Sequence, residues 1–477
     1  MRSPRDIPLL AKQGGESHAA EFRRTRADLF VRLHRELGDI GKINLFGLPC
    51  VSLGSPELVH DVMVEKAKSF EKSLALKMIF HPLAGKGLFT SEGDLWRRQR
   101  KLISPLFFPA TVRGYAPAMN EVIARHLDTW RDGDVIDAGR EMTRITMAVV
   151  GKVLFDADRF DDADELGAAI QTEFNYIADQ GASFSLIAKA SVGAQLFRVE
   201  ELPPWAERLR ERVIDKLSEP FPWPTPERRR LFAAIETLDR RVQEMIDERR
   251  RAGGGRNDLL TRLLQARDED DGAVMTDRQV RDEAMTLFVA GHETTATSTT
   301  WALHFLSRNP ETYRRWKQEV AGLGGKQPTA DDAAHLPYTT GAFKEATRIY
   351  PPAFVLDRVS MEEVEIGGYL FPKWTTFFLS PYALHRRPHL WPDPERFDPE
   401  RFTPEAEAAR PRLAWIPFGA GPRVCIGAGF ALLEAQLLLA QIAQRFDFEP
   451  ADRAPLLPSF MTALRPSRPV RLRIKRL

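Results

Sequence analysis

The segment FGAGPRVCIG, residues 418–427, places one of the chain's two cysteines in a glycine-rich loop directly before a helical pattern. The run that follows, 428–446, contains no proline and is rich in Leu and Ala, which predicts a core helix. Cys425 is therefore expected beside a helix N-terminus, where free backbone N–H groups and nearby Arg423 lower the pKa of a thiol. Metal ligation, haem ligation and redox chemistry all suit such a thiolate.

The three glycines of this loop, Gly419, Gly421 and Gly427, permit backbone conformations and close approaches that a flat cofactor lying against the loop would require. A lone cysteine is most often a small buried hydrophobe. The spacing of fixed residues around Cys425 is, however, far too specific to arise often by chance.

The loop resembles the haem-binding loop of the cytochrome P-450 superfamily, whose pattern Phe-x-x-Gly-x-Arg-x-Cys-x-Gly it matches at every specified position. The resemblance implies that the cofactor is haem b and that Cys425 is the axial ligand of its iron. It also implies that Phe418, Arg423 and Gly427 contact this cofactor.

Composition limits the classes of protein that fit. The chain has 477 residues, 43% of them hydrophobic and 28% charged, which is typical of a globular protein with one large domain or two ordinary ones. A net charge of +2 gives no reason to expect nucleic-acid binding. Two cysteines are too few for a disulfide framework or a zinc site and fit a reducing cytoplasm.

The N-terminal region lacks both a signal-peptide core and an apolar run of about 18 residues, so no membrane span is expected. Because eukaryotic members of the superfamily usually carry an N-terminal anchor, the chain resembles the soluble bacterial type. A cytoplasmic monomer is expected.

Short apolar runs around turn signals predict two hairpins, 43–46 with 50–53 and 364–366 with 369–371, and a late strand over 470–474. Most of the rest has a helical pattern interrupted by Pro and Gly. We therefore expect a mainly α fold with small peripheral β-sheets. The resemblance implies the cytochrome P-450 fold, with the haem between a long central helix and the cysteine loop.

Residues 220–226 (PFPWPTP) and 249–258 (RRRAGGGRND) are predicted to be loops, and neither is a predicted domain boundary. The resemblance places the first between two helices that cover the substrate pocket. Phe221 and Trp223 are then equally well explained as residues of the pocket entrance or as surface aromatics. Residues 1–477 are expected to form one haem domain without a fused reductase or ferredoxin domain.

A long helix is predicted after Thr276 and Gln279, which form a capping-box signature, and up to Asn309, which precedes a proline. It has about 32 residues and a length of about 48 Å. Its segment 290–295 (AGHETT) contains a glycine, an acid and two hydroxyls. These polar residues, together with the hydroxyl residues up to 299, form either a solvated patch or a functional site. A threonine hydroxyl there can replace part of the backbone hydrogen bonding.

The hexapeptide matches the acid–alcohol pair of the superfamily. The resemblance implies that Glu293 and Thr294 are catalytic and supply protons for cleavage of dioxygen, and that Ala290 and Gly291 face the haem.

Trp96 and Arg100 are four residues apart and therefore share one face of a predicted helix, while Arg97, Arg98 and Lys101 point outward. The pair resembles the Trp-x-x-x-Arg element that binds haem propionates. The resemblance implies that Arg423 and Arg358 are further candidates for contacts with the propionates. The outward cluster is either a solvated face or, as the resemblance implies, the place where an acidic redox partner docks.

Glu345 and Arg348 are three residues apart and can pair on one helix face. The resemblance implies that Arg401 joins them in a buried structural network that is not catalytic.

The resemblance at these residues implies a haem-thiolate monooxygenase that inserts one oxygen atom of O2 into an apolar substrate such as a fatty acid, terpenoid, steroid or polyketide. Its electrons are expected from an external ferredoxin or flavodoxin with its reductase. The alternatives are a peroxygenase or isomerase on the same fold and a haem-based binding or sensor protein. By analogy with the fold, the pocket candidates are Leu74, Met78, Ile79, Phe80, Leu287, Phe288, Ala353, Phe354, Val355, Phe460 and Met461.

Overall fold

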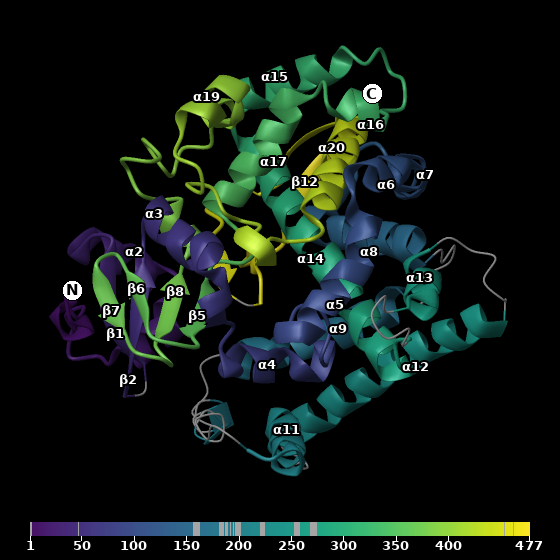
Figure 1. Cartoon of the computed structure of the whole chain (residues 1–477). Coiled ribbons are helices and arrows are strands. Elements are labelled where there is room, and N and C mark those ends of the chain that lie inside the picture. Colours follow the sequence, from purple (N-terminus) through teal and green to yellow (C-terminus); the bar gives the residue numbers. More distant parts are fainter. Residues whose placement is uncertain are drawn as a thin grey trace.

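The long predicted helix, α14 (Asp277–Arg308), runs through the middle of the molecule (Figure 1). Thr276 caps it: its hydroxyl accepts from the Gln279 backbone N–H while the Gln279 side chain accepts from the Thr276 backbone N–H. The helix ends at Asn309, and Pro310 begins the next one. Both predicted ends and the predicted length are confirmed.

The computed structural model describes residues 2–45, 47–155, 163–180, 186, 189–190, 192–193, 195, 202–219, 225–251, 258–267, 274–452, 454–460 and 462–477. Its other α-helices are α1 (His18–Thr25), α2 (Asp28–Leu37), α3 (Pro56–His60), α4 (Leu74–Ala84), α5 (Gly93–Ile103), α6 (Pro109–Gly114), α7 (Ala116–Leu127), α8 (Ala138–Phe155), α9 (Ala163–Gln180), α11 (Pro204–Ser218), α12 (Pro226–Arg251), α13 (Leu259–Gln265), α15 (Pro310–Ala321), α16 (Ala330–Ala333), α17 (Pro337–Ile349), α18 (Pro381–Leu384), α19 (Pro404–Ala409) and α20 (Ala428–Arg445). Single helical turns are η1 (Pro4–Asp6), η2 (Asp61–Glu65, a π turn), η3 (Ala67–Ser69), η4 (Ser104–Phe107), η5 (Pro399–Phe402) and η6 (Gly421–Arg423).

The main core is built around α14, which packs against α8, α17, α20, α12 and α4. A helix contacted from so many directions buries side chains on nearly its whole circumference. Trp301 of α14 is fully buried, and its indole Nε1 donates to the Leu464 carbonyl at 2.8 Å. The helix predicted after the cysteine loop is also present as α20.

The strands lie at the periphery, and the largest sheet is on the left in Figure 1. That sheet has the order β1-β2-β8-β5-β3, with β1 (Ile40–Leu45), β2 (Leu48–Leu53), β8 (Thr376–Leu379), β5 (Leu356–Ser360) and β3 (Phe70–Glu71). Only its β2–β8 pair is parallel. Small antiparallel sheets join β4 (Val135–Asp137), β12 (Arg471–Arg476) and β9 (Phe446–Pro450), β6 (Val364–Ile366) with β7 (Tyr369–Phe371), and β10 (Pro458–Phe460) with β11 (Leu464–Pro466). The mainly α fold class and both predicted hairpins are confirmed.

The prediction of a loop over 249–258 is wrong at its N-terminal end. Helix α12 continues to Arg251, and Arg249 is buried there with its Nε 2.8 Å from Oδ2 of Asp258. Asp258 in turn caps α13 by accepting from the Thr261 N–H. A charged run that resembles a solvated loop here contains a buried ion pair, and residues 252–257 lie outside the described part of the chain.

A buried ion-pair network ties α17 to the segment around η5. The Glu345 carboxylate accepts from Nε and Nη2 of Arg348 at 2.7 and 2.8 Å, and Nε of Arg401 lies 3.3 Å from it. Arg348 also donates to the carbonyls of His385 and Pro394. Because Glu345 and Arg348 are fully buried, each charge depends on the other for its compensation.

Replacement Glu345→Gln leaves Arg348 and Arg401 without their carboxylate and is expected to lower the free energy of unfolding by about 3 to 5 kcal/mol. The matched control is Glu407→Gln. It breaks the more exposed ion pair between Glu407 and Lys344, a neighbour of Glu345 on α17, and should lower the free energy of unfolding by less than about 1 kcal/mol. Urea unfolding followed by circular dichroism measures both. Equal losses in the two variants would contradict the network's role.

Candidate active site

A cavity of about 1140 Å³ lies between α14 and the cysteine loop. Side chains of α14, α20, α4, α5 and the strands of the largest sheet form its walls. Cys425, Ala290 and Thr294 all line it. Residues more than a hundred positions apart in the sequence therefore meet in one cavity.

The cysteine loop holds its shape through backbone contacts. The Cys425 N–H donates to the Phe418 carbonyl at 2.8 Å, and Gly419 and Gly421 have φ values of 71° and 66°, in the left-handed region that favours glycine. A Cβ on Gly421 would overlap the carbonyl oxygen of Met63 in the π turn η2. The backbone contact therefore requires glycine at position 421. At Gly427 no neighbouring atom comes close enough to exclude a side chain.

The pKa of the Cys425 thiol is raised, contrary to the prediction from the sequence. Cys425 opens onto the cavity but has protein on its other sides, and burial disfavours the thiolate. The Gly427 N–H and the Arg100 guanidinium act in the opposite direction without reversing the effect. Two residues separate Cys425 from Ala428, the first residue of α20, and Arg423, which was expected to lower the pKa, pairs with Glu92 instead.

The wall formed by α14 is marked by its exposure pattern. Between Asp282 and Thr300, Ala290 and Thr294 are the two exposed residues, and they lie four apart on one face. Gly291, beside them, is half-buried and also lines the cavity. The helix is continuous here, and the Thr294 hydroxyl donates to the Ala290 carbonyl at 2.9 Å.

The alternative of a solvated patch on α14 is wrong. Thr295, Thr297, Ser298 and Thr299 are all buried. The hydroxyls of Thr295, Ser298 and Thr299 each donate to the carbonyl four residues earlier. Their polar groups are satisfied within the helix, so its polar composition does not require contact with solvent.

Glu293 is adjacent to Thr294 but is directed away from the cavity wall. Its carboxylate is buried and accepts from Nε of Arg465 in β11 at 2.6 Å, with a second contact from Nη2. Burial raises the pKa of Glu293 to about 7, although the Arg465 guanidinium lowers it. Nη1 of Arg465 donates to Gln171 of α9, so one guanidinium joins three elements.

A second acid lies on the other helix that borders the cavity. Glu434 of α20 is fully buried, and burial raises its pKa well above the usual value while the Thr295 hydroxyl nearby lowers it. Neither Arg465 nor Glu434 was anticipated from the sequence. Arg465 belongs to a short hairpin with no local motif, and Glu434 occupies an ordinary position of an apolar helix.

Basic side chains gather with Trp96 on one side of the cavity. Arg423 places its guanidinium carbon 3.9 Å from the centre of the Trp96 ring, donates to the Ser91 carbonyl and pairs with Glu92. Arg100 donates to the Val424 carbonyl at 3.0 Å, and Arg358 to the Asp357 carbonyl at 2.6 Å. All four predicted residues line the cavity.

Lys72 is a further cation of this wall that the sequence analysis missed. Its Nζ lies 5.1 Å from the centre of the Phe89 ring, and burial lowers its pKa well below the usual value, as do Arg423 and Arg358. Its position just before a helix gave no signal of a cofactor contact.

These residues fit a haem. Burial lowers the pKa of Arg100 and of Arg358, and it lowers the pKa of Arg423 to about 10. These cations therefore lie in a poorly solvated place, where the acidic groups of a cofactor would stabilise them. Cys425 offers a thiolate ligand from the loop, and Ala290 and Gly291 leave room on the α14 wall. Phe418 lines the same space.

Eight of the eleven predicted pocket residues line the cavity, namely Leu74, Ile79, Phe80, Leu287, Ala353, Phe354, Val355 and Phe460. Met78 and Phe288 do not, because both are packed in the main core. Phe288 contacts Phe155 and His292 there. Met461, Phe221 and Trp223 lie outside the described residues.

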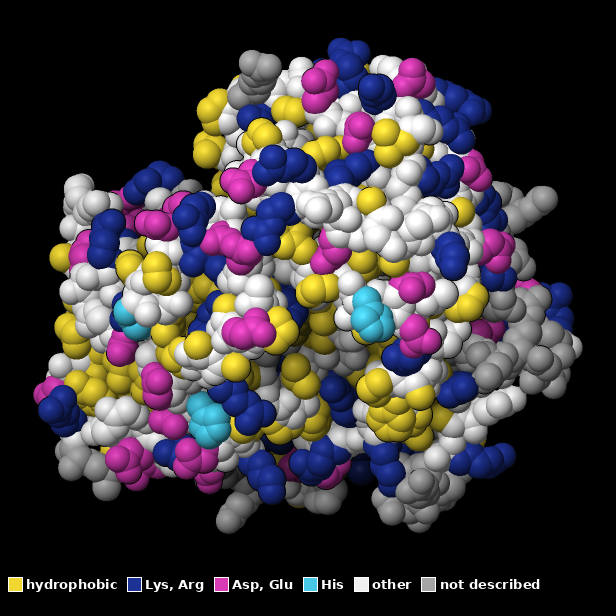
Figure 2. All heavy atoms as spheres, turned by 90° about the horizontal axis from the view of Figure 1, so that it is seen from above, with side chains coloured by type: hydrophobic (Ala, Val, Ile, Leu, Met, Phe, Trp, Pro, Cys, Tyr) yellow, Lys and Arg dark blue, Asp and Glu magenta, His cyan; other side chains and the backbone are white. Residues whose placement is uncertain are grey.

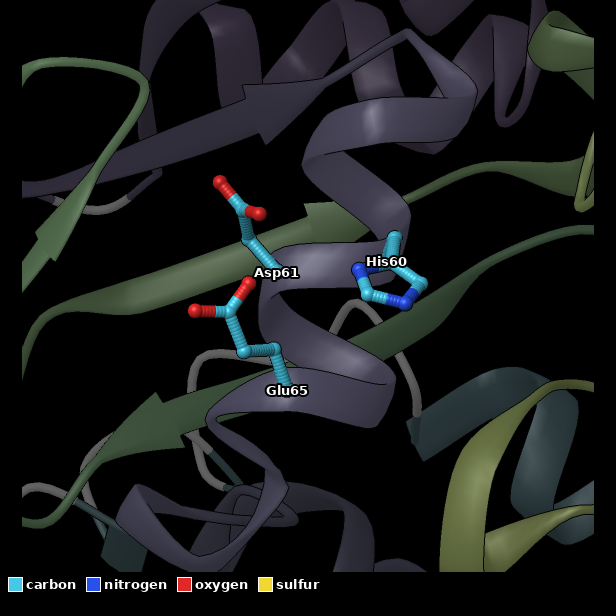
Figure 3. Close-up of side chains that lie close together, drawn as sticks. All are labelled: His60, Asp61 and Glu65. Atoms are coloured by element: carbon cyan, nitrogen blue, oxygen red, sulfur yellow. The ribbon is translucent and has the colours of Figure 1, made fainter.

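Three potential metal ligands lie together outside this cavity. His60, Asp61 and Glu65, on α3 and the π turn η2, have ligand atoms within 4.8 Å of one another (Figure 3). His60 and Glu65 are exposed. Burial raises the pKa of Asp61, and the charge of Glu65 raises it further. None of these three residues is among those that line the cavity, and η2 contacts the cysteine loop through Met63.

The outward residues of α5 are at the surface as predicted from their spacing. Arg97 and Lys101 are exposed, Arg98 is half-buried, and Arg97 pairs with Asp94. In the part of the chain that the structure covers, no helix is both long and apolar enough to span a membrane.

Comparisons with known proteins agree with this geometry. The family model described as Cytochrome P450 matches residues 14–197 and 199–474. Cyclooctatin synthase from Streptomyces melanosporofaciens is 34% identical over 88% of this chain and 85% of its own length. Pentalenene oxygenase from Streptomyces avermitilis is 32% identical over 92% of this chain and 90% of its own length.

A solved structure, the cytochrome P450DA heme domain, superimposes with a TM-score of 0.82 at 26% identity and covers 99% of this chain and 98% of its own. Sequence, fold and the cavity lined by Cys425 thus lead to the same assignment. The chain belongs to the cytochrome P450 family, whose members bind haem b through a cysteine thiolate and act as monooxygenases.

Proposed function

We propose that Cys425 is the axial ligand of haem b in this monooxygenase and that Glu293 and Thr294 supply protons for cleavage of dioxygen. The observation that carries this proposal is the exposure of Ala290 and Thr294 on an otherwise buried stretch of α14, facing the cavity that Cys425 lines. When bound, the haem supplies the iron at which dioxygen is activated.

The four cavity cations and Trp96 are proposed to hold the two propionates of the haem. Arg100, Arg358, Arg423 and Lys72 lie on one wall, and three of them have only backbone carbonyls as hydrogen-bond acceptors among the described residues. Binding of carboxylates there compensates charges that are already buried.

The proton supply is proposed to run from Glu293 to Thr294. A carboxyl with a pKa of about 7 is present in both protonation states at neutral pH, so it can accept and release protons with little cost. The Thr294 hydroxyl donates to Ala290 and so keeps its lone pairs available to orient a water in the cavity. Arg465 holds the carboxylate in place as a positioning residue.

This acid beside a cavity hydroxyl favours the monooxygenase over a peroxygenase or isomerase, which has no need of a proton supply from the protein. A haem-based sensor likewise has no need of it. We therefore retain the monooxygenase as the proposed function and treat the others as outcomes of its tests.

The substrate is proposed to be an apolar molecule, in keeping with the apolar pocket residues and with the names of the relatives, which refer to cyclooctatin and pentalenene. Terpenoids, fatty acids, steroids and polyketides all suit such a cavity. Electrons are proposed to come from a separate ferredoxin or flavodoxin with its reductase, docking near Arg97, Arg98 and Lys101. The chain as one haem domain, its monomeric state and its cytoplasmic location stay predictions.

Cys425→Ser is expected to abolish the red-shifted Soret band of the ferrous–carbonyl complex, because a serine hydroxyl does not replace the thiolate. Absorbance spectroscopy of the reduced protein under carbon monoxide measures this. Cys50→Ser, which removes the other cysteine, should leave the band in place. A red-shifted band in the Cys425 variant would exclude Cys425 as the ligand.

Glu293→Gln is expected to lower turnover by about 100-fold or more, because an amide cannot take part in proton transfer. The measurement is product formed per unit time, together with the fraction of NADPH consumed that yields product. Glu283→Gln serves as a control, since Glu283 is equally buried on α14 but accepts from Leu88 at the far end. Unchanged turnover in Glu293→Gln would contradict the proposed relay.

Arg465→Gln is expected to raise the pKa of Glu293 above its value of about 7, since the guanidinium lowers that pKa and burial remains. The pH at which the protonated Glu293 carboxyl disappears from infrared difference spectra should therefore increase. Arg468→Gln, in a more exposed pair with Asp452, should not change it. A midpoint that stays the same or decreases would show that Arg465 does not control Glu293.

A further inference from the structure

The charges that line the cavity differ from those on the outer surface. Figure 2 shows Lys and Arg interspersed with Asp and Glu over one face of the molecule. The cavity instead has nine basic side chains and two acidic ones. They are Arg5, Arg26, Lys42, Lys72, Lys77, Arg100, Arg358, Lys373 and Arg423, with Glu71 and Asp357.

Four of these cations are accounted for by the haem propionates under the proposed function. Among the others, Lys77 pairs with Glu71 at 3.1 Å, and Lys42 donates to the Pro4 carbonyl at 2.8 Å. Arg5 is exposed, and Lys373 has a partner of its own. Arg26 is left as the cation that the cofactor does not explain.

Arg26 is half-buried at the end of α1, and no described residue makes a hydrogen bond or an ion pair with its guanidinium. Its nearest aromatic neighbour is Phe22, whose ring centre lies 5.9 Å from the guanidinium carbon. Burial lowers the pKa of Arg26, and so does the like charge of Arg23, while Asp179 of α9 acts from a distance in the opposite direction. An arginine in such a place is stabilised by an anion, and the described residues supply none in contact with it.

The backbone of Arg26 supports the same interpretation. Its φ of 50° and ψ of −112° belong to a conformation that glycine adopts readily and arginine does not. Such conformations cost about 1 to 3 kcal/mol, and they are concentrated at ligand-binding positions. The chain thus keeps an arginine where glycine would be more stable.

The surroundings of Arg26 connect it with the substrate side of the cavity. Phe22 and Arg26 line the cavity together with Leu45, Leu74 and Phe354. The next residue, Ala27, is fully buried in a cluster with Phe354, Phe460 and Leu464. The wall that adjoins Arg26 is therefore apolar, and the same cavity extends to Thr294.

We propose that Arg26 binds the carboxylate of the substrate, and that the substrate is a long apolar carboxylic acid whose hydrocarbon chain extends from Arg26 toward α14. This inference rests on the proposed function and narrows its substrate class. The acid end is fixed at Arg26, so oxygen insertion takes place at a carbon remote from the carboxyl group. An uncharged terpene lacks the group that Arg26 recognises.

The test uses three ligands of equal chain length: hexadecanoic acid, hexadecan-1-ol and hexadecyl phosphate. Their dissociation constants are measured from the Soret shift of the ferric holoprotein. The acid should have a dissociation constant at least about tenfold lower than that of the alcohol, as expected for one charge-assisted hydrogen-bonded pair. Equal affinities, or failure of the acid to bind, would overturn the inference, and tighter binding of the phosphate would replace carboxylate by phosphate.

Arg26→Gln should weaken binding of the acid about tenfold and leave that of the alcohol unchanged. Arg23→Gln removes a neighbouring exposed charge of α1 and should alter neither. Arg26→Lys should retain part of the preference for the acid. Loss of affinity for both ligands in Arg26→Gln would show a structural role instead.

Arg26→Gly separates binding from folding. It should raise the melting temperature, because glycine adopts the observed backbone without strain, and should nevertheless weaken binding of the acid. A stabilised variant with undiminished preference for the acid contradicts the inference. Absence of the thiolate-type ferrous–carbonyl band in the wild-type protein is a different result, which contradicts the proposed function itself.

Discussion

The close contact between Gly421 and the carbonyl of Met63 determines where the cysteine loop lies. Only a residue without a side chain permits this approach, and φ values of 71° and 66° at Gly419 and Gly421 turn the backbone toward the cavity. The loop is thereby fixed between the π turn η2 on one side and α20 on the other. This arrangement sets the positions of Cys425, Phe418 and Arg423. The geometry of the site therefore depends on a contact between two backbone segments.

The opposite wall depends on the burial of α14. Because other elements cover almost the whole helix, the few positions left exposed identify the face toward the cavity. Glu293 is on a different face and is held by Arg465 from β11, a strand more than 150 residues later in the chain. The proposed proton supply and the cavity wall are thus supported by segments that the central helix brings together.

Local patterns were sufficient to predict much of this molecule. The Thr276–Gln279 capping box located the start of α14, and turn signals located the two hairpins, since both depend on residues close together in sequence. The spacing of Trp96 and Arg100 likewise placed them on one helix face. Family motifs supplied the positions of Cys425 and Thr294, which line one cavity, and of Glu293, which follows the chain to another face of α14 and pairs with Arg465.

The remaining features depend on tertiary contacts that no local pattern encodes. Lys72, Arg465 and Arg26 acquire their surroundings from distant elements. The raised pKa of Cys425 results from enclosure by the cavity walls, which outweighs the backbone N–H groups considered in the sequence analysis. Arg249 was misassigned to a loop for the same reason, because its partner Asp258 and its burial become visible only when α12 and α13 are packed.

The hydroxyls of α14 have a consequence for how this helix can vary among related sequences. Thr299 and Thr300 each use their single hydroxyl donor on the carbonyl four residues earlier, which already has a partner in the helix. Exchange for valine of nearly the same shape leaves no buried group unsatisfied, so these positions are free to drift between threonine and valine. Thr294 has the same internal bond but faces the cavity, and drift at this position would remove the hydroxyl from the reaction space.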